Sequence, residues 1–98
     1  MIRFNEAIDL IRRRTNNSMG LDGIAEVYIK FEEEREKAHL IFITKDDLDS
    51  TTLTKLAVRY NHLFEDHLDI YTIKILTATN YFKKDRDTFL IWRYSEGF

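Results

Sequence analysis

The feature that most constrains the fold is a repeated change in the spacing of apolar residues, from helical spacing to alternation and back. Helical spacing of three and four residues comes first, at Phe4, Ala7, Ile8 and Ile11. Alternation over residues 24–32 then predicts a strand, and a second strand is predicted at 39–44. A second helical stripe runs through 53–64, followed by predicted strands at 68–77 and 88–94. The predicted order is helix, strand, strand, helix, strand, strand.

This order predicts a single small α+β domain over residues 1–98, with a four-stranded antiparallel sheet packed against two helices. The second and fourth predicted strands are apolar on both sides, whereas the first and third alternate. A strand that is buried on both faces is usually central. We therefore expect the spatial order 1-2-4-3, with the first and third strands at the edges. If both helices cover one face, the other face leaves a large apolar patch, which would favour a homodimer.

Composition excludes several classes of protein. The chain has no cysteine, which rules out a disulfide scaffold, a thiol nucleophile and cysteine-ligated metal sites. The formal net charge of -2 removes the whole-chain basic footprint that is usual in nucleic-acid-binding proteins. No apolar run is long enough to span a membrane, and acidic residues interrupt the N-terminal apolar positions, so we expect no membrane segment and a cytoplasmic location.

The sharpest charge feature is the run Arg12, Arg13 and Arg14 at the end of the first predicted helix. Guanidinium groups bind phosphates and carboxylates bidentately, so the run could clamp an acidic partner. Cations at this end of a helix also stabilise its dipole and its last carbonyl groups. Successive side chains project about 100° apart, so at most two of the three can serve one flat surface.

A second basic cluster lies before the last predicted strand and includes two aromatic residues. Its members are Tyr81, Phe82, Lys83, Lys84 and Arg86. Aromatic rings beside cations are typical of sites that bind single-stranded nucleic acid. Asp85 and Asp87 offset two of the positive charges, which favours the simpler interpretation of a solvated turn.

An acidic cluster of opposite sign follows the first predicted strand. Its members are Glu32, Glu33, Glu34 and Glu36. It could face a basic protein surface, although such clusters are more often solvated. Together with the two basic clusters, it completes the set of candidate partner-binding residues.

Signals for catalysis are weak. The chain has no nucleophile elbow, phosphate-binding loop or dinucleotide glycine motif. His62 and Asp66 are spaced for one helix face, but no further ligand accompanies them. We therefore expect a protein that is not an enzyme and that uses no metal and no cofactor.

By elimination, the sequence favours a binding module that acts through protein–protein interaction. Inhibitors, immunity proteins, mobile-element accessory proteins and assembly subunits are of this kind. The alternative is nucleic-acid binding through Arg12–Arg14 and Lys83–Arg86 with Tyr81 and Phe82.

Overall fold

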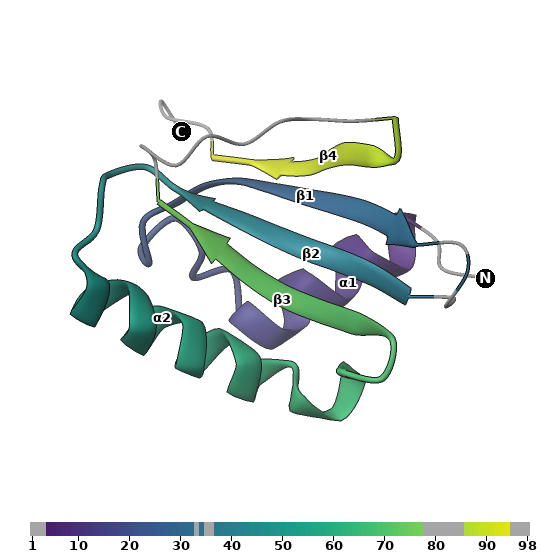
Figure 1. Cartoon of the computed structure of the whole chain (residues 1–98), viewed down its shortest axis with the longest axis horizontal. Helices are drawn as coiled ribbons and strands as arrows, with labels where there is room; N and C mark the ends of the chain where they lie inside the picture. The colour runs from purple at the N-terminus through teal and green to yellow at the C-terminus, as the bar shows by residue number, and fades with distance from the viewer. Residues whose placement is uncertain (1–3, 33, 35–36, 78–85, 95–98) are drawn as a thin grey trace.

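The computed structural model describes residues 4–32, 34, 37–77 and 86–94. Within them lie two α-helices, a short 3-10 helix and four strands (Figure 1). In chain order these are α1 (Phe4–Thr15), β1 (Ile24–Glu32), β2 (Lys37–Thr44), α2 (Ser50–Leu63), η2 (Glu65–His67), β3 (Tyr71–Leu76) and β4 (Thr88–Arg93). The α+β class and the predicted order of helices and strands are confirmed.

The strands form one mixed sheet in the order β3-β2-β1-β4. β1 pairs antiparallel with β2 and with β4, whereas β2 pairs parallel with β3. The predicted order 1-2-4-3 and the all-antiparallel sheet are therefore wrong. The physical reason is α2, which carries the chain back along the sheet so that β3 enters in the direction of β2, as in any strand–helix–strand crossover.

The position of β4 shows why apolar residues on both sides of a strand did not predict which strands are central. β4 is apolar on both sides but lies at one edge, and Phe89 and Leu90 are 43% and 40% exposed. β1 is central although it alternates, because the polar residues Glu26 and Lys30 share the face that carries no helix. A central strand of a sheet covered on one side needs only one apolar face.

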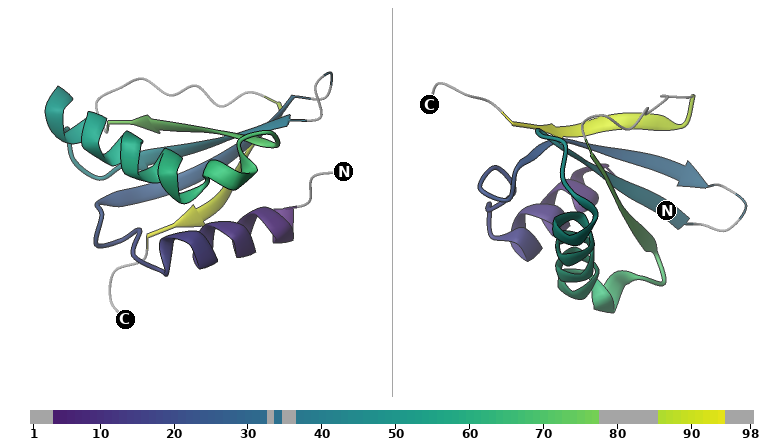
Figure 2. Two further views of the ribbon diagram at one scale, coloured as in Figure 1. Left: turned by 90° about the horizontal axis from the view of Figure 1, so that it is seen from below. Right: turned by 60° about the vertical axis from the view of Figure 1, so that its left-hand side comes forward.

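Both helices pack on the same face of the sheet (Figure 2). Asp49 caps the start of α2, where its side chain accepts a hydrogen bond from the Thr52 amide at 2.7 Å. This carboxylate cap fixes the start of the helix. Between the helices and the sheet lies a core built around Phe42, which packs edge-on against Tyr60 at 5.0 Å and close to Phe64 at 6.2 Å.

The face without helices is not an open apolar surface at its centre. Tyr28 of β1 and its partner Ile41 of β2 lie there, and they are only 2% and 5% exposed within the single chain. At the edge, Leu90 of β4 is more exposed. The large patch that we expected for helices on one face is therefore absent from the centre of this face, and a homodimer stays a prediction.

Candidate functional site

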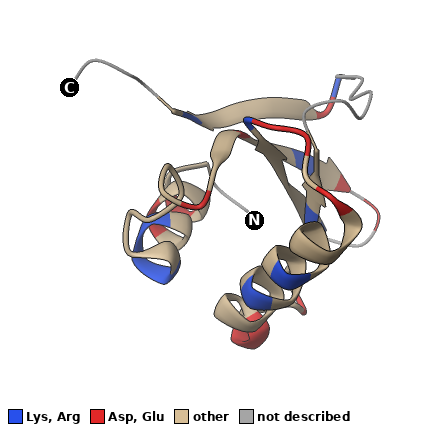
Figure 3. Cartoon of the chain, turned by 90° about the vertical axis from the view of Figure 1, so that its left-hand side faces the viewer, with Lys and Arg blue, Asp and Glu red and all other residues tan. Residues whose placement is uncertain are grey.

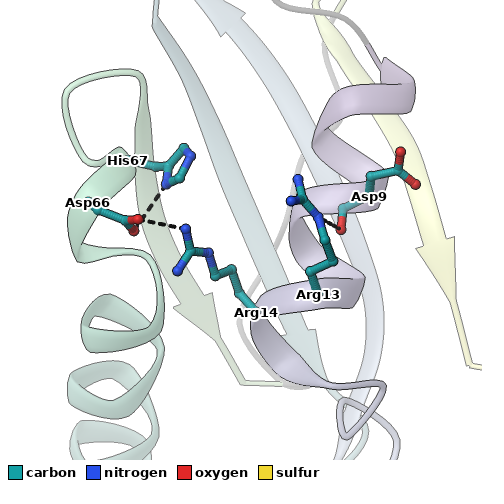
Figure 4. A network of polar contacts seen from close by, with 5 residues as sticks. All are labelled: Asp9, Arg13, Arg14, Asp66 and His67. Carbon is teal, nitrogen blue, oxygen red and sulfur yellow. Dashed lines mark hydrogen bonds and ion pairs between the residues drawn. The ribbon is translucent and has the colours of Figure 1, made fainter.

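The structure separates the three arginines at the end of α1. Arg14 turns toward the other helix and forms an ion pair with Asp66 of η2, with its Nη2 atom 2.6 Å from Oδ2 (Figure 4). Arg13 stays along α1, where its Nε donates to the carbonyl oxygen of Asp9 at 3.4 Å. Arg12 and Arg13 are both exposed. Arg14 thus joins α1 to η2, and Arg12 and Arg13 of the run remain for an external ligand.

Arg12 and Arg13 line an open hollow between the C-terminal end of α1 and the end of β4. Its residues are Arg12, Arg13, Asn16, Asn17 and Trp92, and we call it the basic hollow. None of these lining residues is acidic. Basic residues gather at the end of α1 in the charge-coloured view (Figure 3).

The two asparagines reach the hollow because of the way α1 ends. Asn16 and Asn17 have φ angles of 54° and 61°, a left-handed conformation that asparagine tolerates better than most residues. The amide of Asn17 then donates back to the Arg12 carbonyl at 3.3 Å. This turn holds both side-chain amides on the rim of the basic hollow, exposed beside the guanidinium groups.

Trp92 reaches the hollow because of an irregularity in the pairing of β1 with β4. Leu90 pairs with Tyr28, but Trp92 pairs with Val27, so β4 has one extra residue at this point. In a regular ladder Trp92 would share the face of Leu90, because side chains alternate. The bulge moves the indole to the helix face beside Val27. Simple alternation along the predicted strand 88–94 would place Trp92 with Leu90 and so misses this role, and no glycine or other residue in β4 marks the bulge.

Chemically, the basic hollow combines charge, hydrogen-bond donors and one flat apolar surface. Two guanidinium groups can each hold a carboxylate or a phosphate by paired hydrogen bonds. The half-buried indole of Trp92 offers a surface for an apolar or planar group. Nearby, Arg93 is already paired with Glu26 at 3.0 Å, so it adds little net charge.

Other predicted partner-binding residues do not join the hollow. Arg86 is exposed near the opposite end of β4, and Glu34 is exposed beyond β1. Glu32 lies on the sheet face without helices, with its Oε2 atom 3.0 Å from Nε2 of His39. The remaining predicted residues lie outside the described part of the chain: Glu33, Glu36, Tyr81, Phe82, Lys83 and Lys84.

A second polar cluster, which the sequence did not reveal, centres on Asp22 in the loop before β1. Its carboxylate pairs with Arg59 at 2.5 Å and accepts a hydrogen bond from the Tyr60 hydroxyl at 2.8 Å. The Asp22 side chain is only 12% exposed. Burial, followed by this hydrogen bond, raises the pKa of Tyr60. The cluster fastens the loop to α2, which is a structural role, since both carboxylate oxygens of Asp22 already have partners.

His62 and Asp66, whose spacing in the sequence could suit a metal, are each placed beside other side chains. His62 lies 3.1 Å from Glu65, and Asp66 contacts Arg14 and His67. Among the residues that the structure describes, no three histidine or acidic side chains are placed to share an ion. In the same residues, no helix has the length and apolar character needed to cross a membrane.

Comparison with known proteins adds no assignment: no family model, no curated protein and no solved structure matches the chain.

Proposed function

We propose that this protein is a non-catalytic binding module that recognises an acidic segment of another protein through the basic hollow. The observation that carries the proposal is the placement of Trp92 beside Arg12 and Arg13, with no acid among the lining residues. Tryptophan and arginine are the residue types most enriched where protein interfaces concentrate their binding energy. The positive charges would steer an acidic partner, and the indole would add apolar contact.

The number of cations favours a protein partner over a nucleic acid. Nucleic-acid binding at physiological salt usually neutralises several phosphates. Among the residues that the structure describes in the basic hollow, the available cations are Arg12 and Arg13, because Arg14 is held by Asp66. Two guanidinium groups match one or two carboxylates of a peptide better than they match a continuous phosphate backbone.

Several biological roles fit such a module. An inhibitor, an immunity protein, a mobile-element accessory protein or an assembly subunit would each use one compact surface of this kind. A cytoplasmic location, expected from the sequence, belongs to the same proposal.

The single tryptophan makes the proposal testable by intrinsic fluorescence. Trp92 is the only tryptophan of the chain, so its emission reports on the basic hollow directly. We expect an acidic peptide to change this emission in a saturable titration, and a neutral peptide of equal length to leave it unchanged. Single-stranded DNA and RNA are titrated in parallel across a range of salt concentrations.

Charge-matched variants complete the experiment. Arg12→Gln with Arg13→Gln should lower the affinity for the acidic peptide by about ten-fold or more. Lys55→Gln with Lys74→Gln removes two exposed positive charges elsewhere and should leave the affinity nearly unchanged. Tight binding of nucleic acid with a steep salt dependence would instead assign the hollow to the alternative function.

A further inference from the structure

A cluster of aromatic rings lies at the other end of α1 from the basic hollow. Phe4 of α1 packs edge-on against Phe31 of β1 at 5.3 Å and against Phe89 of β4 at 5.2 Å. Phe31 and Phe89 lie 6.0 Å apart, which closes the triangle. Although the rings contact one another, Phe4 and Phe89 are 40% and 43% exposed. We call Phe4, Phe31 and Phe89 the aromatic cluster.

The aromatic cluster and the basic hollow belong to one continuous strip along α1 and β4. Phe4, half-buried Ile8 and Arg12 follow one another at intervals of four residues, so they lie on one side of the helix. On the strand, Phe89 and Trp92 both lie on the helix face because of the bulge. Eight residues of helix separate Phe4 from Arg12, a distance of about 12 Å along its axis.

We propose that this strip holds an extended acidic segment of the partner protein, with an apolar side chain on the aromatic cluster and a carboxylate on the basic hollow. The inference rests on the proposed function and specifies its ligand. It predicts a fixed spacing in the partner segment between its apolar residue and its acidic residue, which binding to the basic hollow alone would not require.

The spacing follows from strand geometry. Side chains four residues apart in a strand lie on the same face, about 13 Å from one another. This separation is close to the rise of about 12 Å along α1 from Phe4 in the aromatic cluster to Arg12 in the basic hollow. A helical segment would need about eight residues to cover the same distance.

The edge position of β4 also favours an extended segment. β4 is the last strand of the sheet and has β1 as its single strand neighbour among the described residues. Sheet edges bind extended peptides by adding a strand, with side-chain pockets giving specificity. Charge complementarity selects an acidic segment, because the strip has Arg12 and Arg13 at one end.

Synthetic peptides test the spacing. The probe is a fluorescein-labelled nine-residue peptide of serine and threonine with a phenylalanine at its third position and glutamates at its seventh and eighth. We expect this peptide to bind about ten-fold more tightly than one with the glutamates moved to the fourth and fifth positions. Replacing its phenylalanine with serine should weaken binding by a similar factor.

Protein variants test the assignment of the aromatic cluster. Phe89→Ala should lower the affinity for the probe by about ten-fold, whereas Leu90→Ala, equally exposed on the opposite face, should have little effect. Thermal unfolding of each variant checks the fold. If Phe89→Ala unfolds, Phe4→Ser at the start of α1 replaces it.

The possible outcomes separate the two proposals. Binding that depends on the glutamates, Arg12 and Arg13 but not on Phe89 would overturn the extended segment and leave the basic hollow as the site. Binding that does not depend on Arg12 and Arg13 would overturn both proposals. A protein dimer that Phe89→Ala converts to a monomer would assign the strip to a second copy of the chain and overturn the acidic segment.

Discussion

At the residue scale, the contact between Tyr60 and Asp22 is a buried hydrogen bond to a charged group. The Tyr60 ring is fully buried and its hydroxyl donates to Asp22 at 2.8 Å. Tyr60→Phe keeps the ring but removes the donor, and we expect a loss of about 1.5–3 kcal/mol in the free energy of unfolding. Urea denaturation measures the loss. An unchanged midpoint would show that Asp22 is satisfied without Tyr60, by Arg59 and by the Ser18 hydroxyl, which donates to its Oδ2 at 3.3 Å.

Gly23 makes a residue-scale prediction of a different kind. Its φ angle is +83°, and a Cβ atom built there would meet nothing within 4 Å. Gly23→Ala should therefore lower stability through backbone strain alone, by about 1–2 kcal/mol. Because asparagine tolerates this conformation better, Gly23→Asn should lose less. Equal losses in the two variants, measured by denaturant unfolding, would contradict a backbone origin.

At the scale of elements, acid should weaken the start of α2 and the 3-10 helix η2 that follows it. Hydrogen bonding from the Thr52 amide lowers the pKa of Asp49, and hydrogen bonding with His67 lowers the pKa of Asp66. The fold therefore favours both carboxylates in their ionised form. Their contribution is complete above the ordinary value of 3.8 and is lost as the pH falls through the lower folded-state values.

Matched variants test this pH dependence. Asparagine caps a helix about as well as aspartate but does not titrate. Asp49→Asn with Asp66→Asn should therefore reduce the loss of stability between pH 5 and pH 2, measured by thermal unfolding. The same steep loss in the variant as in the original chain would place the acid sensitivity elsewhere.

β4 should be the least protected strand of the sheet. It is six residues long, pairs with β1 alone among the described strands, and contains a bulge. Its amide hydrogens should exchange faster than those of the central strands β1 and β2 in native-state hydrogen exchange. Protection of β4 equal to that of β2 would show that another segment or a second copy covers this edge.

At the scale of the whole molecule, local patterns predicted the elements better than their arrangement. The strand from Ile24 to Glu32 follows from the alternation of its apolar and polar residues, which is a local property. Strand order depends on which strand β3 pairs with after α2. The local pattern of apolar residues does not specify this pairing. The two-sided apolar pattern of β4 was misleading because exposed apolar residues at an edge resemble a buried strand.

Only part of the candidate site could be predicted from the sequence. Arg12 and Arg13 stand out as a cluster in the sequence, and helix geometry limits how many of the run can act together. Trp92 joins them only because an extra residue in β4 reverses its face. The ion pair of Arg14 with Asp66 spans 52 residues and depends on the packing of two helices, so it had no signature in the sequence.

The pairing of β4 with β1 has a consequence for the order of folding. Arg93 and Glu26, which bridge the two strands, are 67 residues apart in the chain. Closing so long a loop costs entropy before any contact offsets it, whereas only residues 33–36 separate β1 from β2 in the chain. We therefore expect β4 to dock after the transition state. Leu90→Ala should speed unfolding while leaving the refolding rate nearly unchanged, in stopped-flow kinetics.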